Sequence, residues 1–345
     1  MSEPPTLTPR DAVDRWLSRQ QLDKADATLS GYRRRLSHFV EFCEDNEIET
    51  VNELTPWDVE SYETRRRGRD VATITLRNEL LTFRQFLRYL ARVGIIDEAV
   101  PKAVELPNVS AADQADETLL EPARAERILS VLRDGKSGVS ARSHAVLEVA
   151  WFTGARLGAM RGLDVGDVDL DDGWVRFQHR PESGTPLKNG KDGERVVGIS
   201  DDVAEAIARY RENAPSQTDQ HGRRPLWETP FGRVSTNTVR TTVYQATLPC
   251  RVGPCPHGKD PETCEWTTQQ QASKCPSSRS PHQIRSGSIT WQLNRGLRAD
   301  VVAERVNASV DVIEQHYDRA DEFDQFEERR RRHLQKLNFE EADNA

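Results

Sequence analysis

Apolar residues recur at three- and four-residue spacing along most of the N-terminal part of the chain, a pattern typical of amphipathic helices. One predicted helix carries Leu36 and Cys43 on its apolar face, which places Cys43 in a core. The next helix begins after Thr55-Pro56, because threonine caps a helix well and proline suits its first turn. A third ends at Gly94, a residue type favoured just past a helix end. Residues 8–100 are therefore predicted to form one helical domain.

Beyond this domain the pattern changes twice. Residues 101–118 are polar, flanked by prolines and without periodicity, and we interpret them as a linker. Helical spacing returns in residues 119–335, interrupted by two strand candidates at 174–177 and 195–199 on either side of a glycine-rich turn. The predicted fold class is therefore mainly α with a small β-sheet, an α+β fold. The last residues, 336–345, are interpreted as an acidic tail.

The overall charge of the chain argues against nucleic acid as a partner. The chain has 48 basic and 56 acidic residues and a net charge of −8, whereas proteins that bind nucleic acid are usually basic. Only 8 of the basic residues are lysines. An acidic excess with scarce lysine is typical of adaptation to high salt, where a charged surface stays soluble. The net charge then says little about partners, and local clusters of basic residues become more informative.

Two arginine triplets, Arg33-Arg34-Arg35 and Arg65-Arg66-Arg67, lie in the predicted helical domain. Such a run can form a solvated helix face, which is the usual fate of charged residues. It can also contact phosphate groups, for which the guanidinium is well suited. The sequence leaves both interpretations open.

The cysteines are interpreted through the expected compartment of the protein. No run of about 18 apolar residues is present, and the N-terminus lacks a secretory signal, so a cytoplasmic protein without disulfides is expected. Four of the five cysteines lie in an insert at about residues 250–275. Four thiolates can hold a structural zinc ion, although unligated thiols in a loop are the alternative. The candidate ligands are Cys250, Cys255, Cys264 and Cys275, with His257 as a substitute for one of them.

Four short stretches of the second domain carry charged or reactive side chains in a fixed order. A glycine turn after an apolar helix presents Arg156, and Lys188 lies in the turn between the two strands. His282 and Arg285 are three positions apart at the start of a helix and so share a face, and Tyr317 follows in a polar stretch. Each feature alone has an ordinary explanation: a surface cation, a chance pair or a packing tyrosine. Their order within one domain is far more specific.

This order resembles the tyrosine recombinases, also called the phage integrase family, and in particular XerC/XerD-like site-specific recombinases. The resemblance covers about residues 8–320. It implies an N-terminal helical, SAM-like core-binding domain and a C-terminal catalytic domain that form a C-shaped clamp on double-stranded DNA. It also implies a homo-oligomer, a tetramer acting on two DNA sites. Arg33, Arg34 and Arg35 thereby become candidates for contacts with the DNA backbone.

The resemblance also implies a role for each residue of the series. Tyr317 would attack a phosphodiester and form a 3′-phosphotyrosyl bond. Arg156 and Arg285 would hold the non-bridging oxygens and stabilise the charge of the five-coordinate transition state. Lys188 would protonate the 5′ leaving oxygen, assisted by His282. The linkage conserves the bond energy, so this chemistry needs no cofactor, neither ATP nor a catalytic metal.

The sequence departs from the family's pattern at two positions. Ala159 stands where the family usually has an acidic residue, and Ala308 where it usually has a histidine or tryptophan nine residues before the nucleophile. These departures favour an alternative, a recombinase-derived DNA-binding protein that does not cleave. A type IB topoisomerase, which uses similar groups, is a third hypothesis. Lys191 competes with Lys188 for the role of the catalytic lysine, because both lie in a long turn.

Overall fold

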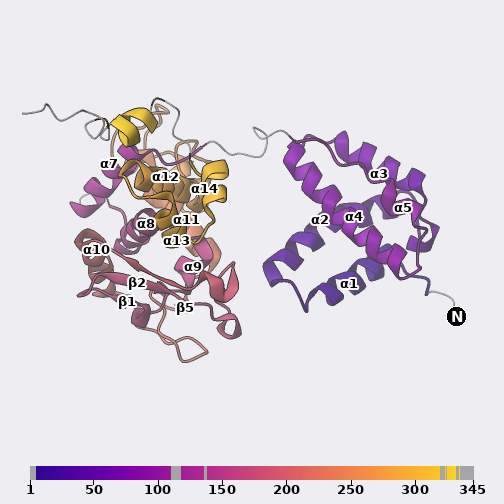
Figure 1. Cartoon of the computed structure of the whole chain (residues 1–345), viewed down its shortest axis with the longest axis horizontal. Coiled ribbons are helices and arrows are strands. Elements are labelled where there is room, and N and C mark those ends of the chain that lie inside the picture. The colour runs from indigo at the N-terminus through magenta and orange to yellow at the C-terminus, as the bar shows by residue number, and fades with distance from the viewer. Residues whose placement is uncertain are drawn as a thin grey trace, which may run out of the picture. The chain divides into compact units, whose positions relative to one another are not determined.

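The computed structural model describes residues 5–109, 118–135, 138–318, 323, 325–331 and 334. The chain divides into two compact units, Met1–Asp116 and Glu117–Ala345 (Figure 1). Both are mostly helical, and the strands form two small sheets in the second unit, which confirms the predicted fold class. No described helix has the length and apolar character needed to cross a membrane.

The first unit is a small helical bundle around an aromatic core. Phe39 packs against Tyr62 and Phe83, with ring centres 5.7 and 4.8 Å apart, and Cys43 is fully buried beside them as predicted. The expected N-terminal cap of the helix that begins at Pro56 is present, since Thr55 and the N3 residue Asp58 form a reciprocal capping box. The helices are α1 (Pro9–Gln20), α2 (Asp26–Asp45), α3 (Pro56–Arg67), α4 (Thr73–Arg92) and the short α5 (Ala99–Lys102).

The predicted linker begins too early. Pro101 lies in α5 and is buried with Val104 in the core of the first unit. Arg77 donates a hydrogen bond to the carbonyl oxygen of Pro107 at 2.7 Å. These contacts attach the chain to the first unit as far as residue 107, and most of the remaining predicted linker lies outside the described residues.

The second unit is organised around one buried helix. Ten of the thirteen residues of α8 are buried, because α7, α10, α11 and α12 all pack against it. The helices are α7 (Pro122–Arg133), α8 (Ala141–Thr153), α9 (Leu157–Gly162), α10 (Asp201–Arg211), α11 (Thr236–Ala246), α12 (Pro281–Asn294), α13 (Ala299–Val306) and α14 (Val310–His316). The two short helices α9 and α14 were not predicted. The predicted acidic tail, 336–345, lies outside the described residues.

An antiparallel sheet of three strands covers one side of this unit. Both predicted strands are present, and β2 pairs with β3 so that Val175 faces Val197. These two side chains are buried, whereas Val196, which precedes Val197 on β3, is 60% exposed, as the alternation of a half-buried strand requires. The strands are β1 (Val168–Asp169), β2 (Trp174–Phe177) and β3 (Arg195–Gly198), with a separate hairpin of β4 (Glu228–Thr229) and β5 (Gly232–Arg233).

Candidate functional site

The glycine turn after α8 presents Arg156 as the sequence predicts. Gly154 is left-handed, with φ of +59°, and a Cβ atom there would meet the Val306 side chain at 2.8 Å. Glycine therefore lets the chain turn sharply against α13. Two residues later, Arg156 occupies the N-cap position of α9, and its guanidinium donates to the carbonyl oxygen of Asn307 at 2.5 Å.

The start of α12 places His282 and Arg285. A capping box between Ser280 and Gln283 fixes the first turn of this helix. Arg285 is only 2% exposed, and one of its terminal nitrogens donates to the carbonyl oxygens of Gly154 at 2.6 Å and Val306 at 2.7 Å. Its Nε and other terminal nitrogen have no hydrogen-bond partner among the described residues. Buried, unsatisfied guanidinium donors are costly unless an anion accepts from them.

Tyr317 closes the same site from the end of α14. Its ring centre lies 5.0 Å from the guanidinium carbon of Arg285 and 5.5 Å from the ring centre of His282. Thr290 of α12 donates to the main-chain oxygen of Tyr317 at 3.0 Å, and the tyrosine side chain is largely buried. The structure thus brings Tyr317, His282 and Arg285 into contact, with Arg156 adjacent through the shared α13 terminus.

The site is strongly cationic. Burial lowers the pKa of Arg285 to about 10, with the neighbouring Tyr317 acting to raise it and Arg156 to lower it. A third guanidinium, Arg195 at the start of β3, lies close enough that burial and the other two arginines lower its pKa to about 9. None of the three forms an ion pair with a carboxylate in the part of the chain that the structure describes. Such an arrangement favours the binding of an anion.

The two candidate lysines lie near this site without touching it. Lys188 and Lys191 are exposed, and neither ammonium group has a hydrogen bond or ion pair with a described residue. The residues that follow them are anchored, however: Asn189 donates to the side-chain oxygen of Asn307 at 2.5 Å, and the Asp192 carbonyl accepts from the Asn307 amide at 3.0 Å. The turn is therefore held against the site while its lysines face solvent.

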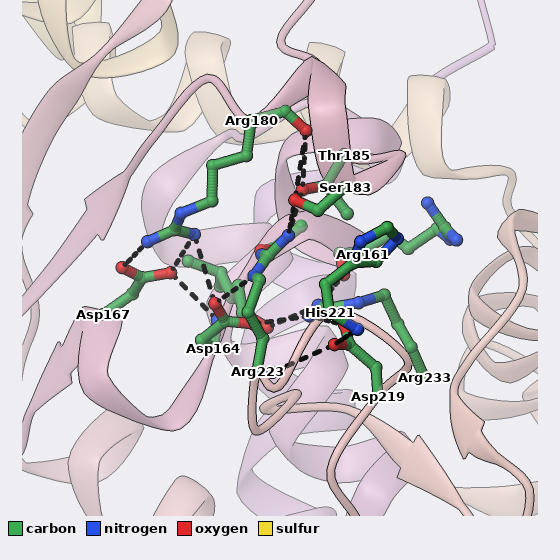
Figure 2. A network of polar contacts seen from close by, with 12 residues as sticks. Arg161, Asp164, Asp167, Arg180, Ser183, Thr185, Asp219, His221, Arg223 and Arg233 are labelled. Carbon is green, nitrogen blue, oxygen red and sulfur yellow. Dashed lines mark hydrogen bonds and ion pairs between the residues drawn. The ribbon is translucent and has the colours of Figure 1, made fainter.

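A polar network supports the segment that leads into this turn (Figure 2). Asp164 accepts hydrogen bonds from Arg223 at 2.7 Å and Arg233 at 2.6 Å, and it pairs with Arg180 at 3.4 Å. Asp167 accepts two further bonds from Arg180, at 2.7 and 2.6 Å. Three guanidinium groups from separate segments therefore converge on two largely buried carboxylates.

The network reaches the lysine-bearing turn through Arg223. Its guanidinium donates to the hydroxyl oxygens of Ser183 at 2.5 Å and Thr185 at 2.8 Å, immediately before Lys188. Thr185 also pairs with Arg180 across an isolated bridge. The network thus fixes the residues that lead into the turn. No sequence motif indicated this network, because the residues that form it are far apart in the chain.

The two departures from the family pattern occupy apolar surroundings. Ala159 is buried in the core on α9, so no carboxylate supports Arg156 from that position. Ala308 packs beside the small core that contains Tyr317. Its predecessor Asn307 supplies the polar side chain at this end of α13, and no motif in the sequence marks this residue.

The structure does not support the zinc prediction. Among the described residues, which include the whole Cys-rich insert, no three His, Cys, Asp or Glu side chains gather in a way that could hold a metal ion. The insert has a small apolar core instead, in which Cys275 packs with Leu248 and Ala272. His257 contacts the Trp266 ring edge-on, and one of its ring nitrogens lies 3.0 Å from the Ser277 hydroxyl. Cys250, Cys255 and Cys264 are free thiols.

The first arginine triplet is largely engaged within its own unit. Arg33 pairs with Asp14 at 2.6 Å, and Arg35 donates to the hydroxyl of Thr82 at 3.2 Å. Arg34 is exposed and forms no ion pair with a described residue.

A helical N-terminal unit followed by an α+β unit with an arginine–tyrosine site defines a class of proteins, those with the two-domain integrase fold. Residues 13–94 match the phage integrase N-terminal SAM-like domain, and residues 118–253 match the phage integrase family. The chain belongs to the phage integrase family, the tyrosine recombinases. The catalytic-domain match includes Arg156 and Lys188 and ends before His282.

Individual relatives agree with this assignment. A tyrosine recombinase XerC of Roseiflexus castenholzii is 26% identical over 184 residues, a match that spans 53% of this chain and 54% of that relative. The integrase of transposon Tn1549, solved in complex with a circular intermediate DNA, is 14% identical with a TM-score of 0.65 and covers 96% of this chain and 100% of its own. A lambda integrase tetramer bound to a Holliday junction is 13% identical with a TM-score of 0.61, covering 88% and 78%. These two solved structures share the fold.

Proposed function

We propose that this protein is a site-specific recombinase that cuts and rejoins DNA strands through Tyr317. The observation that carries the proposal is the buried guanidinium of Arg285, which has unsatisfied donors and lies against the phenol ring of Tyr317. A phosphodiester placed there would accept from those donors and bring its phosphorus next to a nucleophile. Family membership supports the same reaction.

The reaction balances without a cofactor. The phenol of Tyr317 gives up its proton to His282 or to water as its oxygen attacks phosphorus, the bond to the 5′ oxygen breaks, and that oxygen takes a proton from Lys188 or Lys191. Arg156 and Arg285 stabilise the additional negative charge on the non-bridging oxygens. The product holds the DNA 3′ end on the tyrosine, and attack by a free 5′ hydroxyl reverses the step. One phosphate ester replaces another, so ATP is not consumed.

Double-stranded DNA is the proposed partner, and α4 offers it a basic face. Arg77, Arg84 and Arg88 are seven and four positions apart, which places them on one side of the helix. Burial and the other two charges lower the pKa of Arg84, and neither Arg84 nor Arg88 pairs with a carboxylate of the described residues. A cavity of about 520 Å³ adjoins this face between α4 and α5, where Arg84 and Arg88 line it together with Lys102 and its ion-pair partner Glu98. Phosphate groups would relieve the repulsion among these cations.

A second function is favoured by Ala159 and Ala308, which remove two polar groups that the family uses. A chain that binds DNA without cleaving it would tolerate these changes. It would have no need, however, of a tyrosine held against a buried arginine. For either function, the proposed assembly is a tetramer acting on two DNA sites. A structural relative, lambda integrase, supports this proposal, because it has been solved as a tetramer bound to a Holliday junction.

The experiment that tests cleavage uses nicked duplexes, which trap the covalent product because the short strand beyond the cut diffuses away. Wild type is incubated with duplexes that tile the DNA flanking its own coding sequence, and the products are separated on a denaturing gel. We expect a protein–DNA adduct with wild type and none with Tyr317→Phe, which lacks the nucleophilic oxygen but keeps the ring. Sequence-specific binding without an adduct would establish the non-cleaving alternative.

A further inference from the structure

Asn307 joins the predicted catalytic Arg156 to the end of α13. Its backbone is left-handed, with φ of +54°, a conformation that asparagine tolerates better than most residues. The Arg156 guanidinium donates to the main-chain oxygen of Asn307 at 2.5 Å and lies 3.4 Å from its side-chain oxygen. The position of Arg156 is thereby set by this single residue.

The side-chain amide of Asn307 also holds the turn between the two candidate lysines. Its oxygen accepts from Asn189, and its nitrogen donates to the carbonyl oxygen of Asp192, residues that directly follow Lys188 and Lys191. One planar amide therefore fixes two points of this turn at once. Arg195 ties the following strand to the same helix by donating to the Arg305 carbonyl at 2.6 Å.

The surroundings give this amide particular importance. A cavity of about 570 Å³ lies beside the bonds, and Asn189, Asp192, Asn307 and Ala308 contribute to its lining. Ala308 contributes no polar side-chain atom there. The side chain of Asn307 thus contacts both Arg156 and the lysine-bearing turn, beside a cavity that Arg195, Glu194 and Glu304 also line.

We propose that Asn307 is a positioning residue, which holds the turn so that its lysine can protonate the 5′ leaving oxygen of a phosphate bound by Arg156. The proposal rests on the proposed strand cleavage by Tyr317. When the bond between phosphorus and the 5′ oxygen breaks, that oxygen must receive a proton. A turn released from Asn307 delivers this proton more slowly, while phosphate binding and nucleophilic attack persist.

Asn307→Gly tests this role, because glycine keeps the left-handed backbone and the carbonyl that accepts from Arg156 at 2.5 Å, while it removes the amide and with it the longer 3.4 Å bond from Arg156 to the side-chain oxygen. On a nicked duplex that wild type cleaves, we expect adduct formation to slow by about 10- to 100-fold, less than the full contribution of about 100- to 10,000-fold from a general acid, because the lysine is displaced rather than removed. Affinity for the intact duplex should not change. The same reaction is then run on a duplex with sulfur in place of the 5′ bridging oxygen. A thiolate leaves without a proton, so Asn307→Gly should regain nearly the wild-type rate.

The matched control is Ser216→Gly, which replaces another left-handed residue of the same unit whose hydroxyl bonds Arg224. It should react like wild type on both substrates. Arg156→Ala should remain slow on the sulfur substrate, because its role does not involve the leaving group. A wild-type rate for Asn307→Gly on the oxygen substrate, or an equal defect on both substrates, would overturn the inference. Absence of any adduct with wild type on either substrate would instead reject cleavage itself.

Discussion

Gly287 shows how one residue sets the position of the site. It lies on α12 between Arg285 and the tyrosine-contacting Thr290, where a Cβ atom would collide with the main-chain oxygen of Leu120 and approach the Trp151 ring to 3.0 Å. The Leu120 backbone also donates to the Gln283 carbonyl at 3.1 Å, so neither backbone can move away easily. This close approach is available only to glycine.

We therefore expect Gly287→Ala to lower the free energy of unfolding by about 3 kcal/mol, the upper end for overpacking a core. Urea unfolding followed by circular dichroism measures the loss. Gly158→Ala is the control, since that glycine is also helical and a methyl group added to it would have no neighbouring atom within 4 Å. It should leave stability unchanged or raise it by up to about 1 kcal/mol. Equal stabilities of the two variants would contradict the steric argument.

Residues of the candidate site divide into those that sequence reveals and those that it does not. Arg156, Arg285 and Tyr317 stand in short patterns whose order identifies them. Asn307 and Arg195 have no such pattern, because their bonds join positions more than a hundred residues apart. Their partners are brought together only by the packing of α13 against β3.

Among the elements, the segment that joins β2 to β3 is held by polar contacts in addition to the buried side chain of Leu187. Asp164 is the centre of this support, and its removal would leave Arg180, Arg223 and Arg233 close together with less opposing charge (Figure 2). Breaking a buried pair by removing one partner typically costs about 3–5 kcal/mol. We expect Asp164→Asn, which keeps the side-chain size, to lose stability in this range.

Chemical unfolding of Asp164→Asn and of Glu205→Gln tests this expectation. Glu205 forms an exposed pair with Arg209 in the same unit, at 2.7 Å, and such pairs contribute at most about 1 kcal/mol. The two substitutions remove the same charge from a buried and an exposed site. A small and equal effect of both would show that the network does not support the fold.

The elements themselves were predictable where a long pattern defines them. The apolar spacing of α2 and α4 and the capping residues of α3 identify those helices without any tertiary information. The two-residue strands β1, β4 and β5 are too short to show alternation, and the seven-residue α14 is too short to show helical periodicity. The predicted start of the linker, at residue 101, lies too close to the N-terminus, because polar composition does not reveal that Val104 is buried in the core of the first unit.

For the whole molecule, a net charge of −8 must be reconciled with the proposed polyanionic partner, DNA. The paired and unpaired arginines lie in different parts of the structure. Many arginines are neutralised in ion pairs such as Arg66–Glu79, whereas those of the α4 face and of the tyrosine site have no carboxylate partner among the described residues. Local charge therefore decides where an anion binds. This distribution could not be predicted from the sequence, since Arg33 and Arg84 differ only in what surrounds them.

The salt dependence of DNA binding tests this distribution. Each phosphate contact contributes about 0.9 to the slope of log affinity against log salt concentration. If Arg84 and Arg88 each neutralise one phosphate, the double substitution to alanine should weaken binding and reduce the slope by about 2. Arg33→Ala is the matched control, because Arg33 is already paired with Asp14 and should change the slope little. Fluorescence anisotropy with a labelled duplex at several salt concentrations measures both. A larger change in slope for Arg33→Ala than for the α4 double variant would contradict this assignment and place the DNA-binding face at the first arginine triplet. Only residues that contact phosphate change the number of ions released on binding.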